Sequence, residues 1–179
     1  MSYQELSAYS AELELDYNDD EAEESWAGSP FAWIRTLPPR TKGAVGVRLA
    51  QRVLQDAGVA STRIGSQLRV GIQRIAVKYS MEWTAGGFKF EQFKDTAYDF
   101  ILCLGVEPEA AYGWLIPKNE VIENGVWQER EGLGGQHRGQ AAIDTYWLSI
   151  SPGNAPAWLQ PHGGSITQLE AVLVSTFLP

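Results

Sequence analysis

The chain has 179 residues, of which 44% are hydrophobic and 20% are charged, and its formal net charge is −8. This length and composition are normal for a globular domain with a substantial core. No stretch approaches the roughly 20 apolar residues of a membrane span, and the N-terminus lacks the basic and apolar segments of a signal peptide. The one cysteine, Cys103, excludes an internal disulfide, so we expect a cytoplasmic protein with no membrane contact.

The charges are unevenly distributed along the chain. Residues 1–30 contain nine acidic residues and no lysine or arginine, whereas residues 35–78 contain nine basic residues and one acid, Asp56. The acidic segment predicts a solvated, flexible arm over residues 1–28, in which a frayed helix is the alternative, followed by one domain over residues 29–179. A solubilising tail, a segment that binds a partner, and a cover for the basic residues are all consistent with this arm.

The first strongly periodic segment is TKGAVGVRLAQRVLQDAG, residues 41–58. Val45, Leu49 and Val53 recur at four-residue spacing, which predicts an amphipathic helix that ends at Gly58. Three β segments are predicted next, around residues 61–65, 67–72 and 74–83. In the third, alternation places Lys78 on the face opposite Ile75, Val77 and Tyr79.

The rest of the chain continues this mixed order of helices and strands. FKFEQFKDTA (88–97) predicts a short helix, and YDFILCLGV (98–106) predicts a strand covered on both faces, with Cys103 in the core. YGWLIP predicts a strand ended by Pro117. IDTYWLSIS (143–151) predicts a strand, and SITQLEAVLVSTFL (165–178) a helix beginning near Ser165 or Thr167. The expected fold is a single α/β domain with a mixed sheet flanked by helices.

This element order, with a lysine late in the third β segment, resembles the restriction-endonuclease-like, or PD-(D/E)XK, nuclease superfamily. The resemblance covers residues 40–117 and rests on the glycine-bearing helix, RIAVKYS with Lys78, EQFKDTAY with Gln92, and the buried strand YDFILCLGV. Residues 118–179 would then be a C-terminal extension. The resemblance implies a DNA-acting protein from a restriction or defence setting, in which carboxylates hold Mg²⁺ and the lysine positions water.

The sequence lacks the acidic residues that such a metal site uses. Ala76 stands two residues before Lys78, and the hairpin IGSQLRVGIQ contains no Asp or Glu. No carboxylate occurs between Asp56 and Glu82. Mg²⁺ in proteins is bound through carboxylate oxygens, which amide and alkyl side chains do not supply. No metal-binding residue is therefore assigned, and Mg²⁺ is expected only if the protein is an active enzyme.

These observations lead to a DNA-binding or scaffolding protein with a degenerate metal site as the first hypothesis. The candidates for phosphate contact are Lys42, Arg48, Arg52, Arg69 and Arg74.

Two alternatives stay open. One is an active Mg²⁺-dependent endodeoxyribonuclease, in which Lys78 and Gln92 act with displaced carboxylates, Glu82 or Glu91. The other is a protein-interaction module, or a homodimer, that uses the acidic arm. Whether the protein is an enzyme is not decided by the sequence.

Overall fold

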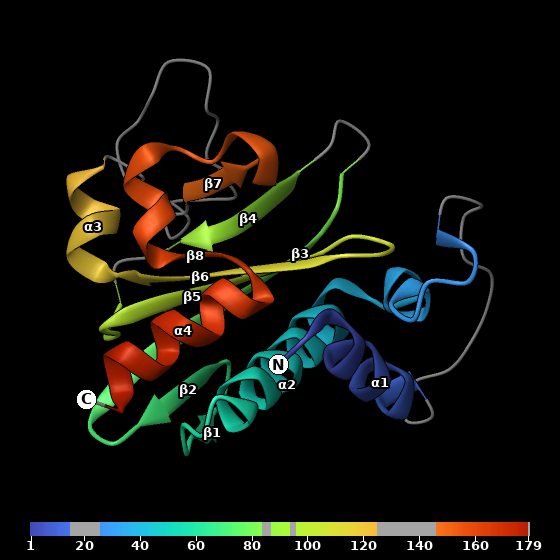
Figure 1. Cartoon of the computed structure of the whole chain (residues 1–179), viewed down its shortest axis with the longest axis horizontal. Coiled ribbons are helices and arrows are strands. Elements are labelled where there is room, and N and C mark those ends of the chain that lie inside the picture. Colours follow the sequence, from blue (N-terminus) through green and yellow to red (C-terminus); the bar gives the residue numbers. More distant parts are fainter. Residues whose placement is uncertain (15–25, 84–86, 94–95, 125–145, 179) are drawn as a thin grey trace, which may run out of the picture.

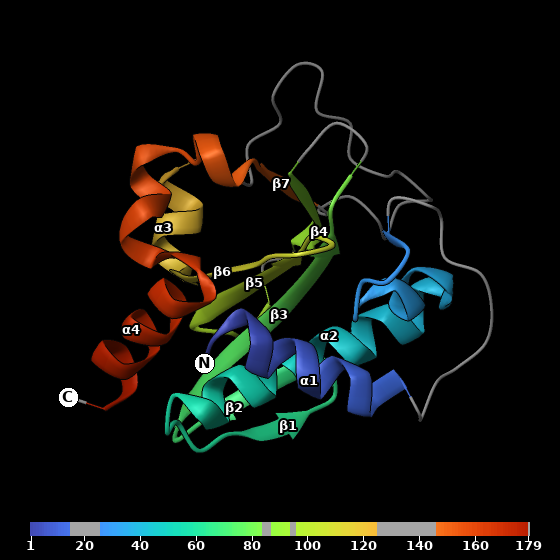
Figure 2. The same cartoon turned by 45° about the vertical axis from the view of Figure 1, so that its right-hand side comes forward.

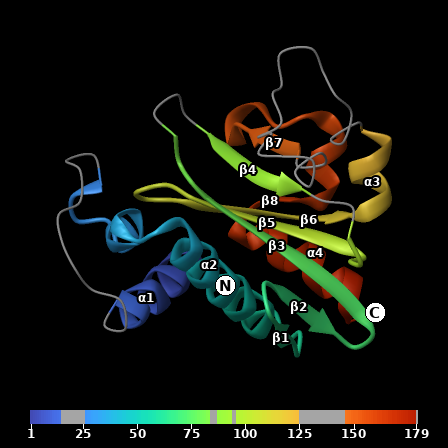
Figure 3. The same cartoon turned by 180° about the vertical axis from the view of Figure 1, so that it is seen from behind.

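A computed structural model of the chain describes residues 1–14, 26–83, 87–93, 96–124 and 146–178. A six-stranded mixed sheet separates two layers (Figures 1 and 3). Helices α1 (Tyr3–Glu14), α2 (Pro39–Asp56) and α4 (Ile166–Phe177) cover one face. The other face carries a two-stranded ribbon, helix α3 (Lys118–Glu123) and the 3-10 helix η5 (Ala157–His162). The predicted α/β domain with a mixed sheet flanked by helices is confirmed.

The main sheet has the strand order β1-β2-β3-β5-β6-β8. Its strands are β1 (Thr62–Ile64), β2 (Gln67–Val70), β3 (Gln73–Met81), β5 (Phe100–Val106), β6 (Ala111–Pro117) and β8 (Gly163–Ser165). Strands β3 and β5 are parallel, and the other neighbours are antiparallel. The strands predicted between residues 61 and 117 on either side of the 88–97 segment are therefore confirmed.

Strand β5 shows why the sheet lies at the centre of the core. Leu102 and Leu104 are fully buried in the layer with α2 and α4, whereas Ile101 and Cys103 are fully buried against the ribbon. An almost continuously apolar strand is the pattern expected when both faces are covered. Burial raises the pKa of the Cys103 thiol, so this residue acts as a small core side chain, as predicted.

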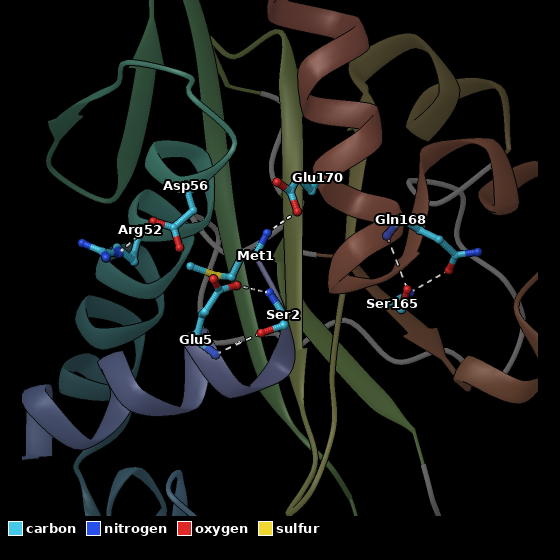
Figure 4. A network of polar contacts seen from close by, with 8 residues as sticks. All are labelled: Met1, Ser2, Glu5, Arg52, Asp56, Ser165, Gln168 and Glu170. Atoms are coloured by element: carbon cyan, nitrogen blue, oxygen red, sulfur yellow. Dashed lines mark hydrogen bonds and ion pairs between the residues drawn. The ribbon is translucent and has the colours of Figure 1, made fainter.

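The two long helices follow the predicted boundaries. In α2, Val45, Leu49 and Val53 are fully buried, and the chain turns away at Gly58, whose φ is +78°. Helix α4 begins with a capping box: the Ser165 side chain accepts a bond from the Gln168 N–H, and the Gln168 side chain accepts one from the Ser165 N–H (Figure 4). No helix in the described ranges combines the length and the apolar character that crossing a bilayer requires.

Residues 3–14 of the predicted arm form helix α1, which is packed against the core and is therefore neither a flexible arm nor a frayed helix. Leu6 and Leu13 lie seven residues apart, so they share one face, and both are buried in the core beside α2. The amino group of Met1 forms an ion pair with Glu170 of α4 (Figure 4). The sequence does not reveal this helix because its composition is rich in acidic residues, and its buried face depends largely on two leucines. Residues 15–25 of the predicted arm lie outside the described residues.

The short helix predicted over residues 88–97 is also wrong. Residues 88–93 form strand β4 (Phe88–Phe93), which pairs antiparallel with β7 (Tyr146–Ile150) and makes the crossover between β3 and β5. Phe88, Phe90 and Phe93 are buried, and the spacing changes from two to three at a bulge that contains Gln92. Gln92 has a φ of +60°, a left-handed conformation uncommon outside glycine. Because the buried phenylalanines are not evenly spaced, the two-residue alternation typical of a strand cannot be recognised in the sequence.

Candidate functional site

A groove follows the part of β3 that has only one neighbouring strand. Strand β2 pairs with β3 no further than Ala76, whereas β5 continues beside β3 to Met81. In the described part of the chain no strand pairs with the other edge of residues 77–81, and a groove of about 1420 Å³ runs along them. Its walls are the N-terminal half of α2, the turn at Gly65 and Ser66, and β4 (Figure 2).

Basic side chains dominate the groove. Its described lining holds six basic and two acidic residues, a net charge of +4. The basic residues are Arg35, Arg40, Lys42, Arg63, Lys78 and Lys89. They come from five separate elements: the 3-10 helix η2 (Ala32–Thr36), α2, β1, β3 and β4. Partial burial, and then the nearby charge of Arg35, lower the pKa of the Lys42 ammonium. Such a concentration of one charge attracts anions.

Acidic side chains gather in a different place. A second hollow, of about 490 Å³, lies beside α1 and is lined by Glu5, Glu12, Asp56 and Glu170, with Arg52. At physiological salt the Debye length is only about 8 Å, so exposed charges beyond that range contribute little to the groove. The net charge of −8 is therefore a poor guide to the field inside the groove.

Lys78 lies in the groove between β3 and β4. The alternation predicted for β3 is confirmed, because Ile75, Val77 and Tyr79 pack toward α2 while Ala76 packs against the ribbon. The Lys78 Nζ donates to the main-chain oxygen of Gln92 at 2.6 Å and lies 5.6 Å from the centre of the Phe93 ring. A second hydrogen bond joins β3 to β4 nearby, in which the Lys89 main-chain N–H donates to the Ser80 Oγ at 3.1 Å. The lysine is thus held at the groove wall by β4.

The groove brings together all four residues predicted for catalysis: Lys78, Glu82, Glu91 and Gln92. Glu82 follows the end of β3 and Glu91 lies on β4, where its Oε1 is 3.0 Å from the Lys89 Nζ. The part of Gln92 that contacts Lys78 is its main-chain carbonyl, presented by the left-handed bulge. The sequence therefore predicts these neighbours, although it assigns Gln92 to a helix.

The residues predicted for phosphate contact are divided by the fold. Lys42 lines the groove, whereas Arg48, Arg52, Arg69 and Arg74 are not among its described lining residues. The Arg52 Nε is 3.1 Å from Asp56 Oδ1, and its guanidinium lies 5.3 Å from the Tyr9 ring of α1. Arg69 and Arg74 face each other across the β2–β3 hairpin. Two basic surfaces are therefore available, of which only the groove contains Lys78.

Lys89 and Trp83 are two groove residues that the sequence did not single out. The signal for Lys89 is the alternation Phe88-Lys89-Phe90-Glu91, which puts the two charged residues on the face opposite the two phenylalanines once β4 is recognised as a strand. Trp83 follows β3, and its main chain is fixed beside the start of β4, since its main-chain N–H donates to the Gly87 main-chain oxygen at 3.0 Å. Its side chain is 55% exposed, which is unusual for a tryptophan.

The side chains that the structure describes do not form a conventional divalent-metal site. Within the described ranges, no three Asp, Glu, His or Cys residues gather closely enough to hold a metal ion. The groove contributes two carboxylates, and one of them, Glu91, is paired with Lys89. A hard cation such as Mg²⁺ needs several oxygen ligands. No reaction step is therefore assigned to a metal.

Glu82 has an acidic neighbour, Glu107, at the end of the adjacent parallel strand. The Glu82 N–H donates to the Val106 oxygen at 2.9 Å, which fixes the two strand ends side by side. Burial, and then the charge of Glu82, raise the pKa of the Glu107 carboxyl, while a hydrogen bond from the Tyr112 hydroxyl acts in the opposite direction. The ionised form of Glu107 is thus disfavoured in the folded protein.

Replacing Glu107 with glutamine is expected to raise the thermal unfolding midpoint at pH 7 by about 1–2 °C, a small value because solvent screens a half-exposed group. A folded pKa above the ordinary carboxyl pKa costs stability as pH rises through that range. The advantage of Glu107→Gln should therefore narrow toward pH 4. Exposed Glu109→Gln makes the same charge change in the same loop, and an equal gain there would contradict this explanation.

Comparison with known proteins supplies no relative for this chain. No protein-family model matches it, and no curated protein is significantly similar in sequence. The function is therefore argued from the geometry and charge of the groove, and the resemblance to the restriction-endonuclease-like superfamily stays a prediction.

Proposed function

We propose that the protein binds nucleic acid along the basic groove, and that this nucleic acid is DNA, as the resemblance to the nuclease superfamily implies. The protein would act by binding or scaffolding, without a conventional metal site. The observation that carries this proposal is the gathering of six basic side chains from five elements around one strand edge. Nothing in local secondary structure requires them to meet, and their mutual repulsion has to be offset when the protein folds. A polyanionic ligand would relieve that repulsion.

The size of the groove also favours a polymer. Its volume of about 1420 Å³ exceeds the roughly 300–1000 Å³ typical of pockets for small molecules. An elongated ligand with regularly spaced negative charges matches both this volume and the net charge of +4. Contacts between lysine or arginine and phosphate give affinity that depends strongly on salt and only weakly on sequence.

Lys78 has a central position in this proposal. Its ammonium is held against the Gln92 carbonyl at 2.6 Å, so it is placed in advance for a phosphate oxygen that approaches along the groove. A lysine contact to phosphate is a point-charge interaction, which arginine can also supply. The charge at this position, more than the shape of the side chain, should therefore determine affinity.

The test is a gel-shift and plasmid-cleavage series with wild type, Lys78→Met and Lys78→Arg, each with Mg²⁺ or with EDTA. Lys78→Met keeps an apolar stem over Phe93 and removes the charge, so DNA affinity at about 0.1 M salt should fall roughly 5- to 10-fold. Lys78→Arg should stay near wild type. Circular dichroism checks that each variant is folded. Absence of DNA binding by the wild type in EDTA and in Mg²⁺ would refute the proposal.

The second candidate function is metal-dependent DNA cleavage. It is favoured by one observation, that Glu82 and Glu91 line the same groove as Lys78. The Mg²⁺ arm of the same series tests it. Cutting that requires Mg²⁺ and is lost in Lys78→Met and Glu82→Gln would establish a nuclease. Binding that is equal in Mg²⁺ and EDTA, with no cutting, would leave the scaffold proposal.

A further inference from the structure

Two groove residues, Trp83 and Lys89, belong to a cluster in which two tryptophan rings contact one lysine. The Lys89 Nζ lies 5.0 Å from the centre of the Trp83 ring and 4.4 Å from that of the Trp147 ring. The same ammonium is 3.0 Å from the Glu91 Oε1. Trp147 comes from β7, which pairs with β4, and Trp83 comes from the end of β3. Two tryptophans, one following β3 and one on β7, thus contact a single lysine on β4.

Of the two tryptophans, Trp83 is the one that lines the groove. Trp83 is 55% exposed. Its ring contacts the Lys89 ammonium through a weak cation–π interaction. The planar base of a nucleotide can replace the Lys89 ammonium on the face of the indole ring, while the ammonium moves to a phosphate of the nucleic acid. Both groups would then exchange a contact within the protein for one with a nucleotide.

Such an exchange requires a base whose own faces are free. In a duplex each base is stacked on both sides, so a tryptophan at the groove wall reaches only its edges or the backbone. An unpaired base presents its face, and aromatic side chains are the usual platforms for bases in single-stranded nucleic acid. The ring face would therefore favour single-stranded over double-stranded nucleic acid, whereas the basic residues would bind the phosphates of both.

We propose that Trp83 and Trp147 form a stacking site for an unpaired base, so that the ligand of the groove is nucleic acid with a single-stranded stretch. This inference rests on the proposed function, since the six basic side chains supply the phosphate contacts that bring the strand to the rings. Lys89 holds the ring faces in the free protein and changes partner from indole to phosphate on binding.

The experiment compares an oligothymidine of about 12 nucleotides with a duplex of the same length, by tryptophan fluorescence and by fluorescence anisotropy. Trp83→Ala should weaken binding of the single strand by about 10-fold, within the range of roughly 5- to 150-fold for loss of a base-stacking aromatic. Binding of the duplex should change less than 2-fold. Trp83→Phe keeps a ring and should recover most of the single-strand affinity.

Two control variants locate the effect. Ile72→Ala removes an apolar side chain that is 96% exposed and outside the groove lining, and it should leave both affinities unchanged. Trp158→Phe removes a tryptophan that lies on η5 and packs against the core on the ribbon side of the sheet, and it should leave the ligand-induced quenching intact.

The outcomes separate this inference from the function on which it rests. Loss confined to the single strand supports the stacking site. Equal losses on both ligands, or none on either, overturn it while the groove remains a nucleic-acid site. A wild-type protein that binds neither ligand refutes the proposed function, and the stacking site with it.

Discussion

Replacing Gly46 with alanine is expected to lower the free energy of unfolding by about 2–3 kcal/mol, the upper part of the range for overpacking a core. Gly46 is a point of close approach between α2 and β3. A Cβ at this position would stand 2.3 Å from the Tyr79 Cβ and 2.6 Å from its Cγ. The Tyr79 Cβ is bonded directly to the β3 backbone, so no side-chain rotation relieves that contact, and the helix or the strand has to move.

The neighbouring Gly43 gives a matched control with the opposite sign. It lies in the same helix and is exposed, and a Cβ added there would meet no atom within 4 Å, so Gly43→Ala adds no contact. Alanine is favoured over glycine inside a helix by about 1 kcal/mol, so this variant should be slightly more stable than wild type. Urea unfolding of both variants measures the difference. Stabilisation by both changes would mean that α2 and β3 are not in close contact.

The Gly46 contact also bears on the groove. Tyr79 is the residue after Lys78, and its hydroxyl is buried and has no hydrogen-bond partner among the described residues. Burial raises the pKa of that hydroxyl. Gly46→Ala would therefore displace a side chain that already fills the space between α2 and β3. Since α2 and β3 both line the groove, the same variant should weaken nucleic-acid binding as well as stability.

Much of the sheet could be predicted because its signals are local. Alternation along β3 places Lys78 opposite Val77, and the apolar run of β5 indicates burial on both faces. The boundaries of α2 and α4 follow from Gly58 and Ser165, whose roles depend on their immediate neighbours. Such features require no knowledge of where distant segments lie.

The segments that were predicted wrongly depend on distant partners. Helix α1 is acid-rich, and its leucines are informative only once α2 is present to cover them. Strand β4 contains the bulge at Gln92, which interrupts its alternation and is supported by pairing with β7, more than 50 residues later. The predicted element order had a helix between β3 and β5, so this part of the resemblance to the nuclease superfamily is not matched.

The groove was predicted only in part, because its charges converge from separate elements. The sequence indicates that residues 35–78 are basic, but it does not say which of these bases share a surface. The fold groups Arg40, Lys42 and Arg63, and it separates them from Arg69 and Arg74 on the hairpin. The distinction has a direct consequence for binding.

Neutralising three groove residues, Arg40, Lys42 and Arg63, to glutamine should reduce nucleic-acid affinity by about 100-fold at roughly 0.1 M salt. Each phosphate contact contributes about 0.7 to 0.9 to the slope of log affinity against log salt, so the slope should become shallower by about 2 to 3. The measurement is an anisotropy titration between about 50 and 200 mM salt, the range in which such contacts change affinity most.

The control is a triple variant with the same change in net charge, Arg52, Arg69 and Arg74 to glutamine, all outside the described groove lining. If the groove is the binding surface, this variant should lose only a few-fold in affinity through the general field and should keep the wild-type slope. If instead it loses affinity and slope while the groove variant does not, phosphate lies along the β2–β3 hairpin. Because both variants carry the same net charge, only the location of the phosphate contacts can separate them.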